Sequence, residues 1–328
     1  MARLFLWAVR EITKMTTASD KVNLIASDII FKRLMRNVCV DIQEGFTVKR
    51  GLKLLLLLLL MLPVAAVNAQ AAKCVVGDCR NGWSVYEDAS GNRYKGDFSN
   101  GKMTGEGKLF FINGDQCEGT FEDGDLTGFG KFIWLNGNRY EGNFIKGMRT
   151  GKGTFTWANG DRYEGDFVNG MRMGRGVFVW ANGDRYEGDF VNSLRTGKGS
   201  FTWASGERYE GDFIDDSITG KGKFFWVNGD RYEGDFIDGK RTGKGKLFWV
   251  NGDRYEGDFV DDIRAGRGLF VWANGSYYEG DFVNGQQTGR GKIVWVNGDG
   301  YEGDFVNGRF QSGERIRIGS QEEEGDRF

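Results

Sequence analysis

Hydrophobic and polar residues alternate in two short stretches that recur along most of the chain. In the unit at residues 161–183 (DRYEGDFVNGMRMGRGVFVWANG), Tyr163, Gly165 and Phe167 alternate with charged residues. The second stretch alternates likewise, and one of its faces holds Gly174, Gly176, Phe178 and Trp180. A period of two puts successive side chains on opposite faces of a strand. The pattern therefore predicts one β-strand over residues 162–167 and another over residues 174–180.

Each predicted strand is followed by an Asn-Gly pair. Val168-Asn169-Gly170 separates the two strands, and Ala181-Asn182-Gly183-Asp184 leads into the next unit. Asn-Gly is the strongest short hairpin signal, because both residues accept a positive φ. We therefore predict a chain of β-hairpins, with Gly165, Gly174 and Gly176 leaving room beneath neighbouring aromatic rings.

The unit repeats every 23 residues without an insertion. The first aromatic position falls at Tyr94, Cys117, Tyr140, Tyr163, Tyr186, Tyr209, Tyr232, Tyr255, Tyr278 and Tyr301. One hairpin buries too little apolar surface to offset the entropy of ordering its backbone, so each must pack on its neighbours. The predicted fold is all-β: an elongated single-layer antiparallel sheet of tandem β-hairpins.

An export signal precedes the repeats. Lys49, Arg50 and Lys53 come before a 14-residue apolar run over residues 54–67, and Ala69 ends a small-residue cleavage pattern. A membrane span needs about 20 apolar residues. We therefore predict cleavage near Ala69 and a secreted or periplasmic protein, the alternative being a retained membrane anchor.

The flanking segments complete the predicted organisation. Residues upstream of the signal carry no clear domain signature, and we expect translation to begin downstream of Met1, at Met35 or near Val48. The predicted parts are an upstream segment over 1–47, the signal over 48–69, a cap with a half repeat over 70–92, the array over 93–310, and a capping strand with an acidic tail over 311–328.

The amino-acid composition favours a β-rich fold and argues against nucleic-acid binding and against catalysis by histidine. The chain has 53 Gly, one Pro and no His, and a formal net charge of −2. Abundant Gly with aromatic residues suits a β-rich fold with many turns. The near-neutral charge does not resemble the basic surface of a nucleic-acid-binding protein. The chain also lacks histidine, the residue that most often acts as a general base in catalysis.

The units resemble the MORN (membrane occupation and recognition nexus) repeat. The resemblance rests on residues 163–167 (Tyr-Glu-Gly-Asp-Phe), 174–176 (Gly-Arg-Gly) and 182–183 (Asn-Gly), and on their counterparts in nearly every unit. It covers about residues 80–310 and departs locally: Cys117 replaces Tyr, and Ser193, Asp216 and Asp262 replace turn glycines. The resemblance implies a twisted sheet of hairpins that acts as a scaffold, a dimerisation element or a membrane-associating module.

Some family members carry a catalytic domain after the repeats, such as a phosphatidylinositol phosphate kinase. Only 18 residues follow Phe310, so we expect no kinase activity, and any kinase-like label would reflect the repeats alone. Glu164 and Asp166 have a spacing suited to paired carboxylates, but the pair recurs in most units, which favours a solvated charge ladder. The Asn-Gly-Asp turns lack the ligand count of a calcium loop. We therefore predict no enzyme activity, no cofactor and no metal site.

Three cysteines lie beyond the signal. Cys74 and Cys79 are close enough for a small disulfide after export. Cys117 sits at an aromatic position, where we expect an apolar thiol, with an intermolecular bridge as the alternative.

The aromatic face is the candidate binding surface. A single-layer sheet has no second sheet to cover its rings, and exposed apolar patches usually mark interaction sites. The candidate residues are Tyr163, Phe167, Trp157, Trp180, Tyr186, Trp203, Tyr209, Trp226, Tyr232 and Trp249. In one interpretation this face binds another protein, a second copy of the chain, or a lipid or glycan; in the other, twist makes the rings cover one another in a structural rod. We predict an exported scaffold that binds another protein or itself, with a phospholipid-binding module as the second choice, since the unit at residues 161–183 is electrically balanced.

Overall fold

The computed structural model describes residues 71–318. It contains a single antiparallel sheet of 22 strands. The strands are β1 (Lys73–Val76), β2 (Gly82–Glu87), β3 (Arg93–Ser99), β4 (Lys102–Phe110), β5 (Gln116–Glu122), β6 (Asp125–Ile133), β7 (Arg139–Ile145), β8 (Met148–Thr156), β9 (Arg162–Val168), β10 (Met171–Val179), β11 (Arg185–Val191), β12 (Leu194–Thr202), β13 (Arg208–Ile214), β14 (Ser217–Phe225), β15 (Arg231–Ile237), β16 (Lys240–Phe248), β17 (Arg254–Val260), β18 (Ile263–Val271), β19 (Tyr277–Val283), β20 (Gln286–Val294), β21 (Asp299–Val306) and β22 (Arg309–Arg317).

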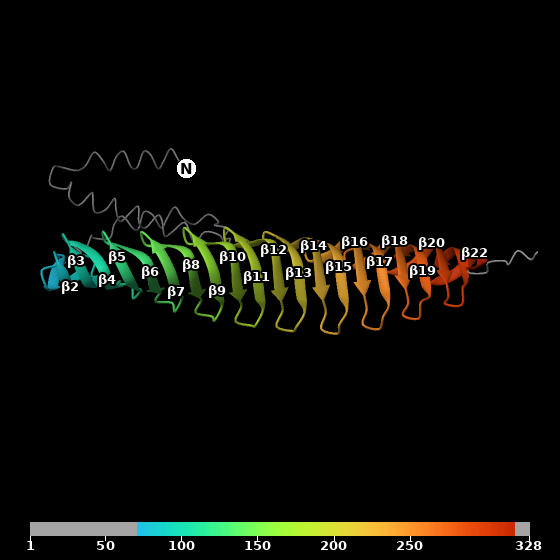
Figure 1. Ribbon diagram of the computed structural model, residues 1–328, viewed down its shortest axis with the longest axis horizontal. Coiled ribbons are helices and arrows are strands. Elements are labelled where there is room, and N and C mark those ends of the chain that lie inside the picture. The colour runs from blue at the N-terminus through green and yellow to red at the C-terminus, as the bar shows by residue number, and fades with distance from the viewer. Residues whose placement is uncertain (1–70, 319–328) are drawn as a thin grey trace, which may run out of the picture. The chain divides into compact units, whose positions relative to one another are not determined.

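Each strand pairs with the strand before it and the strand after it in the chain, as β9, β10 and β11 do. Figure 1 shows the strands following one another in chain order, from β1 at one end of the sheet to β22 at the other. Within residues 71–318, β1 pairs only with β2, and β22 only with β21, so this sheet is open. The predicted all-β, single-layer sheet of hairpins is confirmed.

The predicted signal and the upstream segment lie outside the described residues, as does the acidic tail. Within residues 71–318, no helix has the length and apolar character needed to cross a membrane.

Two kinds of turn join the strands, and the sequence predicted only one of them correctly. Asn169 and Gly170 have φ of 50° and 83°, which is the type I′ geometry expected for Asn-Gly. In the other turn only Gly183 has a positive φ, of 96°, and its N–H donates to the carbonyl of Trp180. That longer turn is therefore not type I′. We call the row of two-residue turns the short-turn edge, and the opposite row the long-turn edge.

The short turns keep their conformation in the three hairpins where another residue replaces the second turn residue, glycine. Ser193, Asp216 and Asp262 keep positive φ values of 72°, 69° and 71°. Nη2 of Arg195 donates to the carbonyl of Asp216 at 2.8 Å, and Nε of Arg195 contacts the Asp216 carboxylate at 2.8 Å. An arginine from the preceding repeat thus holds the turn in a conformation that glycine adopts more readily.

A β-bulge interrupts each hairpin and corrects the prediction for Gly174. The register between β9 and β10 shifts between Met173 and Gly176, and Gly174 has φ of 61°. A Cβ atom on Gly174 would meet the Asp166 carboxylate rather than a ring, at 3.3 Å. Gly174 therefore lies outside the aromatic packing, because the extra residues of the bulge change the phase of the alternation.

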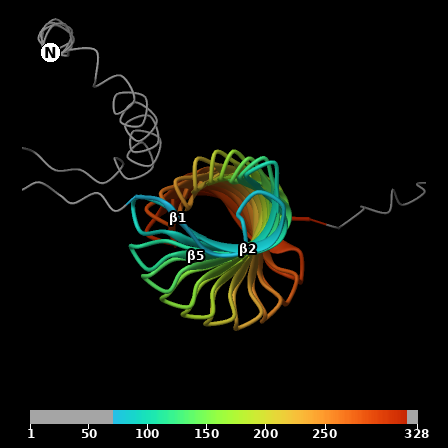
Figure 2. The same ribbon diagram turned by 90° about the vertical axis from the view of Figure 1, so that its left-hand side faces the viewer.

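The sheet is strongly twisted and curled. Figure 2 looks along the sheet and shows the turns of successive hairpins fanning out around its axis. The curl brings the rings of one face together, so that Tyr140, Tyr163 and Tyr186 are 0% exposed in a sheet without a second layer. The core of the protein is therefore one face of a single sheet.

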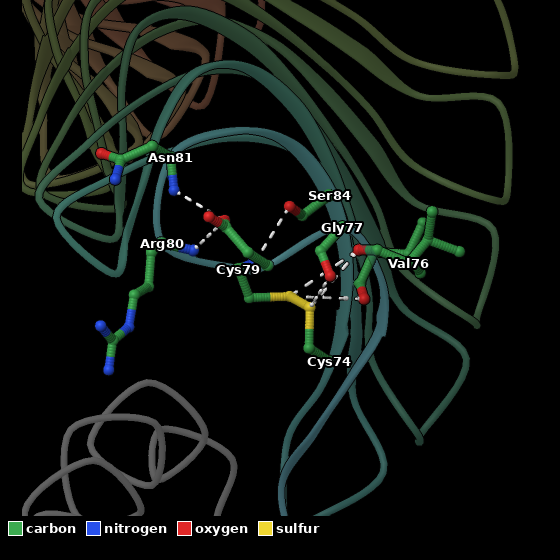
Figure 3. Close-up of a disulfide and its surroundings, with 9 residues drawn as sticks. Cys74, Val76, Gly77, Cys79, Arg80, Asn81 and Ser84 are labelled. Carbon is green, nitrogen blue, oxygen red and sulfur yellow. Dashed lines mark hydrogen bonds between the residues drawn. A yellow bond between two sulfur atoms is a disulfide. The ribbon is translucent and has the colours of Figure 1, made fainter.

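The two ends of the sheet differ from the repeats. At the N-terminal end, Cys74 and Cys79 form the expected disulfide, with a Cα–Cα distance of 5.8 Å (Figure 3). The N–H of Cys79 donates to Oγ of Ser84 at 3.2 Å, which ties the loop to β2. At the C-terminal end, β22 begins at Arg309, four residues before the strand predicted over Gly313–Ile318.

Candidate functional site

Tyrosine and phenylalanine form a buried row along the aromatic face, unbroken from Tyr140 to Phe305. The Tyr163 ring packs edge-on against Phe167 at 5.2 Å and against Phe190 of the next repeat at 5.1 Å. Its hydroxyl donates to the carbonyl of Asp166 at 3.2 Å. Burial raises the pKa of Tyr163 to about 12. Each tyrosine thus joins its own hairpin to the next one.

Half of the predicted binding residues belong to this row. Phe167 is 2% exposed, and the remaining four are 0% exposed: Tyr163, Tyr186, Tyr209 and Tyr232. A partner cannot contact these rings while the sheet is folded. In this row, the rings therefore cover one another, as the second of the two interpretations of the aromatic face predicted.

The tryptophans form a second row that stays half-buried. Trp157 packs at 4.4 Å from Phe155 and at 5.1 Å from Phe178 of the next repeat. The predicted binding residues in this row share its half-buried state: Trp157, Trp180, Trp203, Trp226 and Trp249. The Trp row, defined by these five residues, is therefore the part of the candidate site that a partner can reach.

An arginine between the two aromatic rows was missed by the sequence analysis. The guanidinium carbon of Arg172 lies 5.1 Å from the centroid of Phe178, 5.4 Å from Phe190 and 5.7 Å from Trp157. Burial lowers the pKa of Arg172 below its ordinary value. The signal was available, since arginine recurs at the same position of five repeats: Arg149, Arg172, Arg195, Arg241 and Arg264. These side chains fill the space between the rows and stack on their rings.

The opposite face carries an ion-pair ladder. Lys152 contacts Asp166 of the neighbouring strand at 2.8 Å, and Glu164 pairs with Arg162 at 2.6 Å. Both carboxylates considered as a catalytic pair are therefore engaged with basic side chains, as a charge ladder requires. The same face is hollowed into a groove of about 500 Å³ across β15–β19, lined by Gly245, Gly257 and Gly268 and by lysine, arginine and glutamate side chains. The sequence analysis did not foresee this groove.

The polar side chains of the long turns form hydrogen bonds within their own turn and to the next turn. Oδ1 of Asp161 accepts the N–H of Ala181 in the next repeat at 2.8 Å, and its Oδ2 accepts from Nδ2 of Asn159 at 3.0 Å. In the described part of the chain, no three acidic or sulfur side chains come together in a way that could hold a metal ion. The carboxylates of the Asn-Gly-Asp turns therefore hold successive turns in line.

Cys117 is 4% exposed, and burial raises the pKa of its thiol to about 12. A thiol in this position is neither accessible nor ionised at neutral pH. The buried position agrees with an apolar role and leaves no surface for a bridge to a second chain.

Comparison with known proteins identifies the repeat. The MORN repeat model matches ten consecutive segments: residues 94–116, 117–139, 140–162, 163–185, 186–208, 209–231, 232–254, 255–277, 278–300 and 301–311. A search of curated protein sequences finds no match.

Solved structures give weaker similarities. The TCP10 domain of CPAP from Danio rerio has 12% identity and a TM-score of 0.34, over 64% of this chain and 94% of that domain. The TCP domain of Drosophila melanogaster CPAP, solved with a proline-rich motif, has 13% identity and a TM-score of 0.24, over 65% of this chain and 97% of that one.

Proposed function

Because the chain belongs to the MORN repeat family, we propose that it is a non-catalytic scaffold for protein–protein interaction that also associates with itself. The half-buried Trp row carries this proposal. Five tryptophans at one spacing give a partner a long, rigid surface of large rings, the residue type most enriched where protein interfaces gain their affinity. Packing on the phenylalanines of successive strands fixes the positions of these rings, as Phe155 and Phe178 do for Trp157.

We further propose that the protein works outside the cytoplasm, after cleavage near Ala69. The disulfide between Cys74 and Cys79 supports this location, because disulfides form and persist in oxidising compartments. N-terminal sequencing of the protein recovered from the exported fraction tests it. A mature chain that still begins upstream of residue 54 would contradict cleavage and indicate an anchor.

Affinity capture from the exported fraction tests the scaffold. The bait is the native protein, and the comparison is a Trp157→Ala/Trp180→Ala/Trp203→Ala variant that is shown to fold by its circular dichroism. We expect the variant to lose the main protein partner. Retrieval of the same partners by both baits would show that the Trp row is not the binding site.

Vesicle sedimentation separates this function from lipid binding. The unit at residues 161–183 carries three positive and three negative charges, and the whole chain has a formal net charge of −2, whereas binding to anionic headgroups requires a basic patch. We therefore expect the protein to stay in the supernatant with vesicles of phosphatidylserine and phosphatidylcholine. Pelleting that salt abolishes would favour the phospholipid-binding module instead.

A further inference from the structure

A row of arginines crosses the charged face close to the long-turn edge of the sheet. In six consecutive repeats an arginine is the first residue of the strand that follows a long turn. The six residues, called the Arg row, are Arg139, Arg162, Arg185, Arg208, Arg231 and Arg254. Each precedes a buried tyrosine along its strand, so the Arg row lies on the face opposite the aromatic rows.

Phenylalanine stacks on two members of the Arg row. Phe225 stands opposite Arg208, and the guanidinium carbon lies 4.5 Å from the centroid of its ring. Phe248 stands opposite Arg231 in the same way, at 4.4 Å. A guanidinium that stacks on a ring keeps its N–H groups free at its edges, where a carboxylate can accept from two of them.

Part of the Arg row is neutralised within its own strands. Three members pair with the glutamate two residues further along: Arg162 with Glu164, Arg185 with Glu187, and Arg208 with Glu210. Glu164 and Glu187 both face Val177 on β10, where no lysine competes for them. These arginines have little charge left to offer a ligand.

Lysine takes the glutamate away from the next two members. On β15, Glu233 pairs with Lys223 of the facing strand at 3.2 Å. On β17, Glu256 pairs with Lys246 at 2.9 Å in the same way. Within residues 71–318, the arginines of these two strands therefore have no acidic partner, and both are exposed: Arg231 and Arg254.

Two adjacent free arginines distinguish this part of the face. Arg139 also lacks an acidic partner among the described residues, but the next member of the row, Arg162, is paired. The face is also hollowed here, since a second groove of about 490 Å³ across β12–β15 meets the first one at Glu233, which lines both. Free donors, stacked rings and open space thus coincide over β13–β17.

Spacing and charge select the ligand. Arg231 and Arg254 are two strands apart, which is roughly 10 Å at the usual strand separation. Glu233 and Glu256 lie on the same face and repel a polymer that carries a negative charge on every unit, as a nucleic acid does. A protein segment with separated acidic residues avoids this repulsion. In the polyproline II conformation, residues three apart lie on one side of the segment at roughly 9 Å, which matches the arginines.

We propose that the charged face binds an acidic segment of another protein, which lies across β13–β17 in the polyproline II conformation with two acidic side chains, three residues apart, on Arg231 and Arg254. Each carboxylate accepts two hydrogen bonds from its guanidinium. The neutral residues between them pack against Phe248, which stands between the two arginines. The site lies on the face opposite the Trp row and goes beyond the proposed function, because it gives the scaffold a second binding surface.

Fluorescence anisotropy tests the binding, with protein produced from the full-length coding sequence and a labelled peptide of four Glu-Pro-Pro triplets. The spacing control is an isomer of this peptide, four Glu-Pro pairs followed by four prolines. The charge control has glutamine in place of glutamate. We expect the triplet peptide to bind about fivefold or more tightly than its isomer, and the glutamine peptide not to bind. A triplet peptide that does not bind, or that binds no better than its isomer, would overturn the proposal.

Arg231→Gln/Arg254→Gln is expected to raise the dissociation constant of the triplet peptide about tenfold or more, because it removes both guanidiniums. The matched control, Arg162→Gln/Arg185→Gln, removes the same charge from two paired members of the Arg row and is expected to change the constant by about twofold or less. Circular dichroism establishes that both variants fold. Equal effects of the two variants would overturn the assignment of the site.

Lys223→Ser/Lys246→Val tests why the two arginines are free. The changes install residues found at this position in other repeats and return Glu233 and Glu256 to the arginines of their own strands. We expect the peptide to bind about tenfold more weakly, because each carboxylate then competes with a glutamate. Unchanged binding would contradict the pairing that sets these arginines apart.

Polygalacturonate, which carries a carboxylate on every unit, is the competitor that separates a protein partner from an anionic polysaccharide. We expect it to displace the triplet peptide only at about tenfold or more higher carboxylate concentration, because Glu233 and Glu256 repel its additional charges. Displacement at equal carboxylate concentration would overturn the protein segment in favour of a polysaccharide. The capture experiment on the Trp row tests the proposed function separately, since the two surfaces lie on opposite faces.

Discussion

The ring of Tyr163 lies directly over Gly176 of the neighbouring strand. A Cβ atom on Gly176 would be 2.6 Å from Cζ of Tyr163, a separation that real Cβ atoms do not show. Gly165, which faces Gly176 across the β9–β10 ladder, lies under the same ring. The tyrosine is fully buried because two glycines let it lie against the backbone, and this arrangement recurs along the array.

Gly176→Ala is expected to destabilise the protein by about 1–3 kcal/mol, because the added methyl group forces the Tyr163 ring away from the backbone. Urea denaturation followed by tryptophan fluorescence measures the change. Gly130→Ala is the matched control, since Gly130 holds the equivalent position in the hairpin where Cys117 replaces tyrosine. There a Cβ would meet the carbonyl oxygen of Glu118 at 3.0 Å and Cδ1 of Leu126 at 3.2 Å, so the overlap is smaller than the 2.4–2.6 Å contacts with the Tyr163 ring, and we expect a smaller loss. Equal losses in the two variants would contradict the role given to the ring.

Alkaline pH is expected to unfold the array between pH 10 and 12. Burial raises the pKa to about 12 for Tyr94, Tyr140, Tyr163, Tyr232, Tyr255 and Tyr278, from an ordinary value of 10.0. The folded protein then holds these protons more tightly than the unfolded chain, so the stability is fully present below pH 10 and is lost as the pH rises toward 12. Phenolate absorbance and circular dichroism are recorded together. Ionisation of these tyrosines near pH 10 with the sheet intact would refute the prediction.

Asp212→Asn is expected to weaken the β13–β14 bulge by about 0.5–1.5 kcal/mol at neutral pH. Oδ2 of Asp212 accepts the N–H of Lys221 at 2.9 Å, and Oδ1 pairs with Lys198 at 2.5 Å. The hydrogen bond from Lys198 lowers the pKa of Asp212 below the ordinary 3.8. The stability from its charge is therefore present above pH 3.8 and is lost as the pH falls through the lower, folded value. Urea titrations at neutral and acid pH check this: the difference between wild type and variant should shrink in acid.

Most of the fold followed from the sequence because one period governs both the strands and the turns. The alternation around Tyr163 and the Asn169-Gly170 pair specify a hairpin locally, and repetition leaves the next hairpin as the neighbour. The position of Gly174 could not be obtained this way. A bulge changes which face a residue occupies, and only the pairing of β9 with β10 reveals the shift.

The candidate site was predictable in part. The sequence placed Tyr163 and Trp157 on one face, but it could not tell the buried ring from the half-buried one, since that depends on the curl of the sheet. The sequence analysis did not single out Arg172, although the recurrence of arginine at this position indicated a fixed environment. The groove on the charged face is lined by glycines in register across the four strands β16–β19, and this register is a property of the assembled sheet.

The second repeat shows how the packing adapts when the tyrosine is missing. Cys117 is 4% exposed and Leu126 is 5% exposed, and Leu126 stands where other repeats have the stacked arginine. Its Cδ1 atom lies 3.1 Å from the position of a Cβ on Gly119 and 3.2 Å from that on Gly130. Leucine therefore fills the space over the glycine pair that a tyrosine ring fills elsewhere.

Cys117→Tyr alone is expected to destabilise this hairpin by about 1–3 kcal/mol, because the new ring and Leu126 compete for one space. Leu126→Arg alone is expected to destabilise it as well, since it uncovers the glycines and places a guanidinium without a tyrosine ring beneath it. The double variant Cys117→Tyr/Leu126→Arg recreates the packing of Tyr163 with Arg172, so the two changes should couple favourably by about 0.5–3 kcal/mol. Urea denaturation of the four proteins gives this coupling energy. Additive losses would mean that the two residues do not share the space over Gly119 and Gly130.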